Sequence, residues 1–329
     1  MGLKMQKIKK IAPIIISLII ALVLPIFVKN NYYVTLLDQA LVNIIAVIGL
    51  NFITGLTGQV NLGMAGIFAA GSYTSALLTT KLGVNCWLGL IASIIVGIII
   101  GYVLGYPSLR IKGIYLTLTT IGFGEIMRLL LTNMVNITGG TQGVLGIPSL
   151  SLFGFELNTP RRMYFFLVAV VCLMAWIAIR IVKGRWGREF KAVLNDDTAL
   201  ASVGIDISKV KLNSFILCSV FTCVAGSFYA HLMGYIDPSD YTFDMSTRFL
   251  MMLMLGGIGS VPGSIIGGSI ITILPEILRF LKEYYWLVFS VIILIIILVL
   301  PYGLVSIKDL PFVRKLFGLN KNSLGESNE

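Results

Sequence analysis

Long apolar segments follow one another along almost the whole chain. Each is close to the roughly 20 residues that a helix needs to cross about 30 Å of hydrocarbon. With 57% hydrophobic and only 12% charged residues among 329, the chain holds more apolar surface than one soluble core can bury. The sequence therefore predicts an all-α fold, a polytopic membrane bundle of about ten transmembrane helices. The predicted spans cover residues 11–28, 36–54, 62–80, 85–106, 113–133, 163–182, 212–234, 243–258, 263–281 and 284–302.

The glycine-rich run 256–263 decides between ten spans and nine. It follows a segment, 243–258, that is barely long enough to cross the membrane. A turn at this run gives ten spans, whereas a kink within one helix gives nine. With ten spans and a cytoplasmic N-terminus, 17 Lys and Arg residues fall on the cytoplasmic side and six outside. Nine spans would move four basic residues of the C-terminal tail outside, so the distribution favours ten.

This topology divides the chain into a cytoplasmic N-terminus (1–10), a transmembrane domain (11–302) and a cytoplasmic tail (303–329). The two main polar insertions are an external loop, 134–162, and a cytoplasmic loop, 183–211. We interpret the formal charge of +10 as a consequence of topology, so no nucleic-acid partner is expected. We expect membrane lipid to surround the transmembrane domain.

Cofactor and metal motifs are absent from the sequence. The four cysteines form no CxxC pair, and the single histidine, His231, is most simply a packed or interfacial residue. The chain also lacks a G-x-x-x-x-G-K-[ST] phosphate loop, so it should not bind ATP in that manner. We expect neither a metal nor a cofactor in this chain.

The first candidate stretch, 51–73, reads NFITGLTGQVNLGMAGIFAAGSY and places polar residues between two apolar runs. Polar groups at membrane depth need partners or a water-filled cavity. One interpretation is a broken helix that lines a substrate path; the alternative is tight helix packing with a short turn at 55–61. The predicted path residues, including three from the external loop, are Thr57, Gln59, Asn61, Ser72, Tyr73, Thr138, Thr141 and Gln142.

The second candidate is a pair of charges within a predicted span. Glu125 and Arg128 are three residues apart, close enough to pair on one helical face. Charges inside a span are costly and are functional candidates by default. We favour a structural ion pair, because a site for a zwitterion needs unpaired donors and acceptors.

The third candidate is the cytoplasmic loop 183–211. Asn195, Asp196 or Asp197 could cap a short helix near Thr198, and Gly204 is well placed to end it. Such a helix could dock into a groove of a partner protein, although a solvated basic loop is the plainer alternative. The residues predicted to engage a partner are Arg188, Asp196, Asp197, Ala199, Ala201 and Gly204.

At these stretches the sequence resembles the LivM-type permeases, which are membrane subunits of ABC importers for branched-chain amino acids. The similarity covers about residues 40–300 and involves several motifs in the same order. These are GLTGQVNLG with GSYTSALL, LRIKGIYLTLTTIGFGEIMR with TGGTQG and GIP, GREFKAVLNDDTALASVGID, and GSFYAHLMGYIDPSDY with GGIGSVPGSIIGG. Met64 departs from the pattern, since many relatives have histidine there, and Asn61 stands where serine is common.

The resemblance implies a transport subunit in the bacterial cytoplasmic membrane with no catalytic activity of its own. Its implied partners are a second homologous permease, two cytoplasmic ATPase subunits that use ATP and Mg, and an extracytoplasmic amino-acid-binding protein. It also implies that the segment around Ala199, Ala201 and Gly204 engages the ATPase.

Three other functions stay open at this point. A urea permease, or one for another small amide or amino acid, would have a related sequence. A self-contained secondary transporter would need its own coupling-ion site, for which Glu125 is the one strong ionisable candidate. An intramembrane enzyme is disfavoured because no recognisable nucleophile, base and metal set is present.

Overall fold

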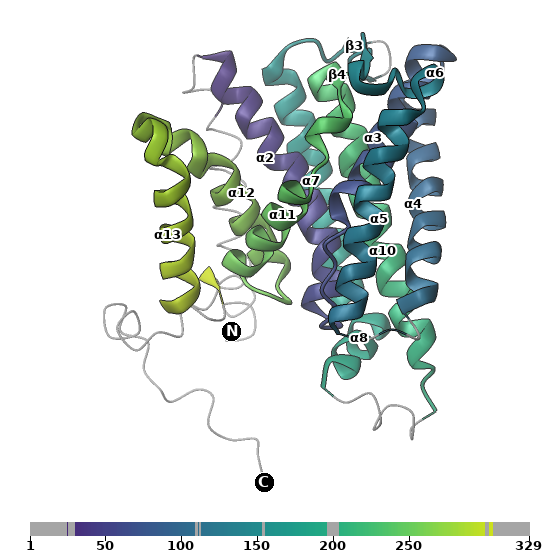
Figure 1. The fold of residues 1–329 in the computed structure, drawn as a ribbon, viewed down its shortest axis with the longest axis vertical. Coiled ribbons are helices and arrows are strands. Elements are labelled where there is room, and N and C mark those ends of the chain that lie inside the picture. The colour runs from purple at the N-terminus through teal and green to yellow at the C-terminus, as the bar shows by residue number, and fades with distance from the viewer. Residues whose placement is uncertain are drawn as a thin grey trace, which may run out of the picture.

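The computed structural model describes residues 30–108, 113–152, 155–195 and 204–299, together with residues 25, 111, 303 and 304. These residues form a helical bundle, as the sequence predicts (Figure 1). The first predicted span, 11–28, lies almost entirely outside the described residues. The long helices are α2 (Asn31–Leu50), α3 (Met64–Lys81), α4 (Cys86–Ser108), α5 (Ile114–Asn133), α7 (Pro160–Lys183), α10 (Ile207–Met233), α11 (Phe243–Gly256), α12 (Val261–Ile277) and α13 (Tyr285–Val299).

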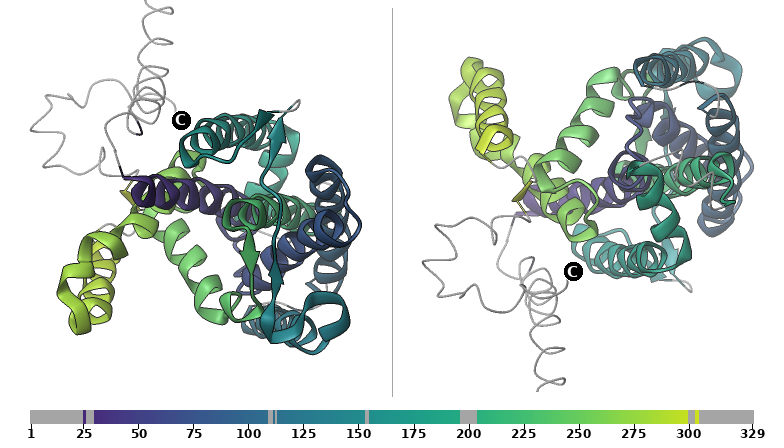
Figure 2. Two further views of the ribbon diagram at one scale, coloured as in Figure 1. Left: turned by 90° about the horizontal axis from the view of Figure 1, so that it is seen from above. Right: turned by 90° about the horizontal axis from the view of Figure 1, so that it is seen from below.

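Six helical segments of the described chain are long and apolar enough to cross a membrane. They are Asn31–Gly55, Cys86–Ser108, Ile114–Asn133, Pro160–Lys183, Ile207–Met233 and Val261–Phe280. The first joins α2 to a π-helical turn, Asn51–Gly55. α10 packs against α4, α3 and α2, and α2 also packs against α12 and α7, so α2 and α10 form the centre of the bundle (Figure 2).

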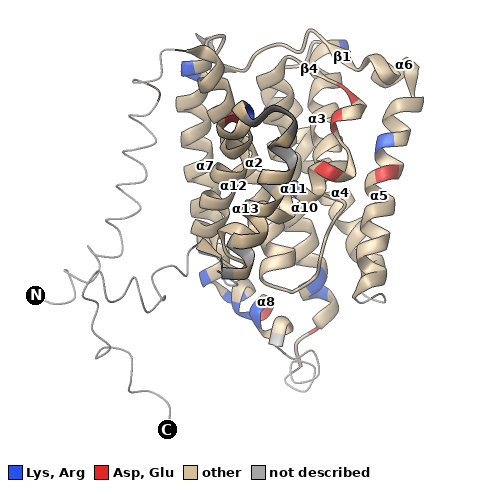
Figure 3. Ribbon diagram, turned by 60° about the vertical axis from the view of Figure 1, so that its left-hand side comes forward, with Lys and Arg blue, Asp and Glu red and all other residues tan. Residues whose placement is uncertain are grey.

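Short elements lie at the two ends of the bundle. One end, which we call the strand end, holds α6 (Val135–Thr138), η2 (Gly140–Gln142), β1 (Val144–Leu145), β2 (Ser151–Leu152), β3 (Phe155–Glu156), β4 (Tyr235–Ile236) and η3 (Pro238–Asp240). β1 pairs with β4 and β2 with β3, both antiparallel. The opposite end, the α8 end, holds α8 (Arg185–Asn195) (Figures 1 and 3). A 3-10 segment, η4 (Leu278–Tyr284), joins α12 to α13.

Glycine allows α3 and α10 to cross with their backbones in contact. A Cβ atom at Gly226 of α10 would lie 2.2 Å from the carbonyl oxygen of Phe68, and one at Gly71 of α3 would lie 2.3 Å from that of Cys223. Side chains of any size would force the two helices apart. This crossing explains the abundance of small residues in these two segments.

Two helices begin inside the bundle. An extended segment, 56–63, leads from the α8 end to the start of α3, and the N–H of Leu62 donates to Thr120 Oγ1 (3.1 Å) within α5. On the other side, residues 235–242 lead from the strand end to the start of α11. The two helix starts meet where the N–H of Ala65 donates to Ser246 Oγ (2.9 Å).

The glycine-rich run 256–263 is a turn between two helices. α11 ends at Gly256 and α12 begins at Val261, with Gly257 and Gly259 at φ 126° and 79°. A Cβ at Gly256 would lie 2.0 Å from Gly263 O, and one at Gly263 would lie 2.8 Å from Gly256 O. The close approach of the two helix ends therefore requires glycine at Gly256 and at Gly263. The run is therefore not a kink within one helix, and α11, at 14 residues, is about 21 Å long, shorter than a full span.

His231 is a packed residue that ties α10 to the strand end. One ring nitrogen, Nδ1, lies 2.8 Å from the carbonyl oxygen of Pro148, and the other, Nε2, lies 2.8 Å from Ser75 Oγ. Because a carbonyl only accepts, Nδ1 carries a hydrogen. The two contacts together fix the orientation of the imidazole ring.

Candidate functional site

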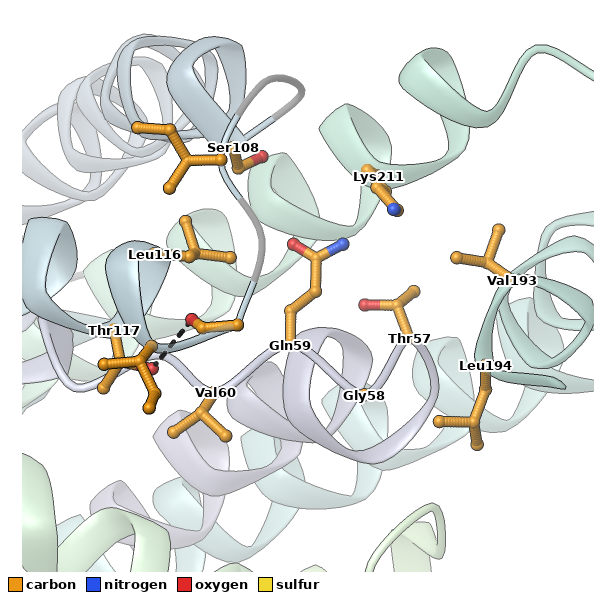
Figure 4. Close-up of a pocket in the computed structure, with 13 residues that line it drawn as sticks. Thr57, Gly58, Gln59, Val60, Ser108, Leu116, Thr117, Val193, Leu194 and Lys211 are labelled. Atoms are coloured by element: carbon orange, nitrogen blue, oxygen red, sulfur yellow. Dashed lines mark hydrogen bonds between the residues drawn. The ribbon is translucent and has the colours of Figure 1, made fainter. Parts of the chain in front are cut away.

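A cavity of about 630 Å³ opens at the α8 end of the bundle (Figure 4). Four parts of the chain surround it: the extended segment after α2, the α4–α5 connection with the start of α5, the end of α8, and the start of α10. The lining residues are Thr57, Gly58, Gln59, Val60, Ser108, Ile111, Gly113, Ile114, Leu116, Thr117, Val193, Leu194 and Lys211.

Gln59 supplies the unsatisfied polar group of this cavity. Its backbone is held because Thr54 Oγ1 donates to the Gln59 carbonyl (3.0 Å). Its side-chain Oε1 and Nε2 are both buried, yet neither has a hydrogen-bond partner among the described residues. A buried amide without hydrogen-bond partners is destabilising. The Gln59 amide is therefore expected to bind a ligand or water in the cavity.

Lys211 brings a positive charge to the same space. It lies in the second turn of α10 and is only 8% exposed. Figure 4 shows its side chain and the Gln59 amide directed into the cavity. The N-terminus of α5, at Gly113 and Ile114, adds the partial positive charge of a helix start.

One wall of the cavity is formed by α8. Phe190 and Val193 are buried against the bundle, whereas Leu194 is 50% exposed. A Cβ at Gly58 would lie 2.6 Å from Leu194 Cδ1, so α8 directly contacts the extended segment that carries Gln59. This contact joins α8 to the segment that carries Gln59.

Two predicted path residues, Asn61 and Ser72, are buried within the protein and lie outside the cavity lining. Asn61 Oδ1 accepts from the N–H of Gly63 (2.9 Å), which fixes the turn before α3. The hydroxyl of Ser72 lies 3.0 Å from the carbonyl oxygen of Phe68 and 2.9 Å from that of Gly226. Their contacts favour a role in helix packing, whereas Thr57 and Gln59 line the cavity.

The other predicted path residues lie away from the cavity. Tyr73 is buried on α3, with its ring 6.0 Å from that of Tyr241, and its hydroxyl has no partner among the described residues. The Thr138 hydroxyl is directed at the chain just before it, 2.6 Å from Leu131 O in α5 and 2.9 Å from Met134 O. Thr141 and Gln142 lie at the strand end, where both are exposed. The structure thus brings only Thr57 and Gln59 together in one cavity.

Glu125 and Arg128 form an ion pair on the outward face of α5. Arg128 Nε donates to both carboxylate oxygens of Glu125 at 3.1 Å. The side chains remain 48% and 29% exposed, respectively. Charged groups in a span almost always face protein or water, so this face of α5 is unsuited to contact lipid.

Asp38 is an ionisable residue that the sequence analysis missed. It lies on α2 and is fully buried, one turn after Val34, which belongs to a small apolar cluster with Tyr164 and Val168 of α7. Neither carboxylate oxygen has a hydrogen-bond partner among the described residues. Asp38 falls within the predicted span 36–54, and an acidic residue inside a span was itself an available signal.

The predicted partner-binding residues are described only in part. Arg188 is exposed on α8, and Gly204 has φ +81°, a left-handed conformation that favours glycine. The short helix predicted near Thr198, with Asp196, Asp197, Ala199 and Ala201, lies outside the described residues. Beyond it, Asp206 caps α10, and hydrogen bonds from the backbone and side chain of Lys209 lower the pKa of the Asp206 carboxyl.

The site also includes residues that the sequence alone did not single out. Lys211 was counted only as a topological charge, yet it is a lysine one turn inside an apolar helix, which is itself an available signal. Val193 and Leu194 carried no such signal, because their place in the cavity depends on how α8 folds back against the bundle.

The described chain is a helical bundle with six segments long and apolar enough to cross a membrane and with a cavity at its α8 end. Residues 32–298 match the family described as the permease component of the branched-chain amino acid transport system. The chain belongs to this family.

Individual relatives agree with that assignment. The chain is similar to the high-affinity branched-chain amino acid transport system permease protein LivM of Salmonella typhimurium, with 31% identity over 87% of this chain and 73% of the relative. LivM of Escherichia coli K12 is 30% identical over the same shares. LivH of Escherichia coli K12 is 26% identical over 79% of this chain and 89% of the relative. No solved structure gives a significant match.

Proposed function

We propose that the chain is a permease subunit of an ABC importer that moves leucine, isoleucine and valine across the bacterial cytoplasmic membrane. The observation that carries the proposal is the family match over residues 32–298. The α8 end then faces the cytoplasm, together with both termini, and the strand end faces outward. The cavity around Gln59 lies at the inner end of the substrate path.

The partners follow from the family to which the chain belongs. ATP and Mg are used by two ATPase subunits on the cytoplasmic side, in keeping with the lack of a phosphate loop in this sequence. A homologous permease completes the pair and covers the charged face of α5, which lipid would not solvate. An amino-acid-binding protein delivers substrate at the strand end.

The contact between α8 and Gly58 supplies a route for coupling. An ATPase that displaces α8 would move Leu194, and Leu194 touches the segment that holds Gln59. Coupling between sites needs an element whose position both sites influence. We assign that role to α8 and the loop that follows it.

Transport should depend on ATP and on the partner subunits. The experiment is uptake by the purified complex in liposomes, comparing leucine, isoleucine, valine, alanine and urea side by side. We expect saturable uptake of the three branched-chain amino acids only with ATP and binding protein. A preference for urea would instead indicate that the chain is a urea permease of this family.

Asp38 motivates one competing function, ion-coupled secondary transport, because an unpartnered carboxylate in a span can serve as a proton or cation site. That function predicts uptake by this chain alone, driven by an ion gradient and abolished in Asp38→Asn. Under the proposed function, the chain alone transports nothing, with or without the substitution.

Replacement of Gly204 with valine should weaken the contact with the ATPase. The space around this residue is open, because a Cβ added there would meet no described atom within 4 Å, so the effect comes from the positive φ. A β-branched residue there costs on the order of 1 kcal/mol and displaces the preceding segment. ATPase association and solute-stimulated hydrolysis in the reconstituted complex should both fall. Gly204→Asn, which tolerates this conformation, is the control, and wild-type behaviour of the valine variant would place coupling elsewhere.

A further inference from the structure

The cavity at the α8 end is complementary to a carboxylate on one side. Lys211 places an ammonium group in its wall, and α5 begins beside it. None of the described lining residues is acidic. An anionic group of a small molecule would therefore find a favourable potential here, since both the cation and the helix start attract it.

Hydrogen-bond acceptors for an ammonium group also line the cavity. The hydroxyls of Thr57 and Ser108 donate to Ile53 O (2.8 Å) and Gly105 O (2.6 Å), so each leaves only oxygen lone pairs to a ligand. Gln59 Oε1 is a third acceptor, and it has no described partner. The cavity thus offers groups of both kinds that a zwitterion requires.

Apart from Thr117, the remaining side chains of the lining are apolar, and they are valine, leucine and isoleucine. Val60 and Leu116 form one part, and Val193 and Leu194 form the wall contributed by α8. A volume of about 630 Å³ lies within the usual range of small-ligand pockets, so a single amino acid fits with water to spare.

We propose that this cavity binds a free branched-chain amino acid from the cytoplasmic side and that the bound molecule slows further import. The carboxylate pairs with Lys211, the ammonium group with Gln59, and the side chain lies against Val193 and Leu194. Because the ligand bridges the bundle and α8, it holds α8 in place and opposes the movement that ATP hydrolysis drives. This regulation rests on the proposed transport function.

Binding is tested first, without ATP. The permease–ATPase complex, free of binding protein, is placed in phosphatidylcholine nanodiscs and titrated with radiolabelled leucine. We expect saturable binding, with leucinamide competing about tenfold less well because it lacks the carboxylate. Lys211→Met should weaken leucine binding by about tenfold, whereas Lys211→Arg should retain it. The matched control is Lys209→Met, since Lys209 is on the same helix but does not line the cavity.

Inhibition is tested next, in phosphatidylcholine liposomes with the ATPase subunits outside and leucine with binding protein inside. Leucine added outside should reduce ATP hydrolysis in the wild type, and leucinamide should need about tenfold higher concentration. Normal transport without leucine binding would overturn the inference alone, whereas absence of ATP-dependent transport would overturn the proposed function. Loss of leucine binding on adding phosphatidylglycerol would assign the cavity to a lipid headgroup and also overturn the inference.

Discussion

Replacing Gly226 with alanine is expected to prevent the α3–α10 crossing and to leave little folded protein. The added Cβ would lie 2.2 Å from a backbone carbonyl oxygen, that of Phe68, which has no rotamer to escape the contact. The helices must separate, at a cost of about 3 kcal/mol or more in the free energy of unfolding. The measurement is the thermal unfolding midpoint and yield of the purified chain in detergent.

Gly122→Ala is the matched control for this prediction. It makes the same substitution within a long helix, but a Cβ at Gly122 of α5 has no described atom within 4 Å. Alanine there should be neutral, or stabilising by roughly 0.5–1 kcal/mol, because it favours the helix. Equal stability of the two variants would contradict the tight crossing.

Gln59→Leu is expected to reduce transport by about tenfold or more while the protein becomes no less stable. Leucine removes a buried amide whose Oε1 and Nε2 have no partner among the described residues. Removing such a group should stabilise the fold by about 1–3 kcal/mol, since its desolvation is no longer uncompensated. Opposite changes in activity and stability are typical of a residue kept for function.

The loss of transport and the gain in stability of Gln59→Leu are measured as uptake and as thermal stability of the reconstituted complex. Gln39→Leu serves as the control, because Gln39 is half-buried on α2 and, among the described residues, donates to the sulfur of Met233 (3.7 Å). A weak bond to sulfur contributes little, so its loss should leave transport nearly unchanged. If Gln59→Leu transports normally, the segment around it is merely a packing turn.

The sequence was sufficient to predict the helical bundle, because apolar segments long enough to span a membrane can adopt few structures other than helices. It also singled out Gln59 and Thr57, which line the cavity, because polar residues between two apolar runs are conspicuous. The pattern of apolar residues does not show where a helix starts within the membrane, so the predicted span 62–80 gave no sign that α3 begins deep in the bundle. The meeting of Ala65 with Ser246 joins residues 181 positions apart.

The cavity itself was beyond prediction for a related reason. Its walls come from the segment after α2, the start of α5, α8 and α10, and only tertiary packing brings them together. Gln59 and Asn61 look equivalent in sequence, as two polar residues two positions apart between apolar runs. In the structure Gln59 points into the cavity, while Asn61 Oδ1 accepts from the N–H of Gly63 in its own turn.

Met64, at the start of α3, is fully enclosed by weak donors. Its sulfur lies 3.6 Å from Cys218 Sγ, 3.8 Å from Thr222 Oγ1 and 3.9 Å from Asn61 Nδ2. A histidine at this position could gain or lose a proton near neutral pH, whereas a thioether has no proton to exchange. Acidification of the surroundings therefore leaves the charge at this helix start unchanged.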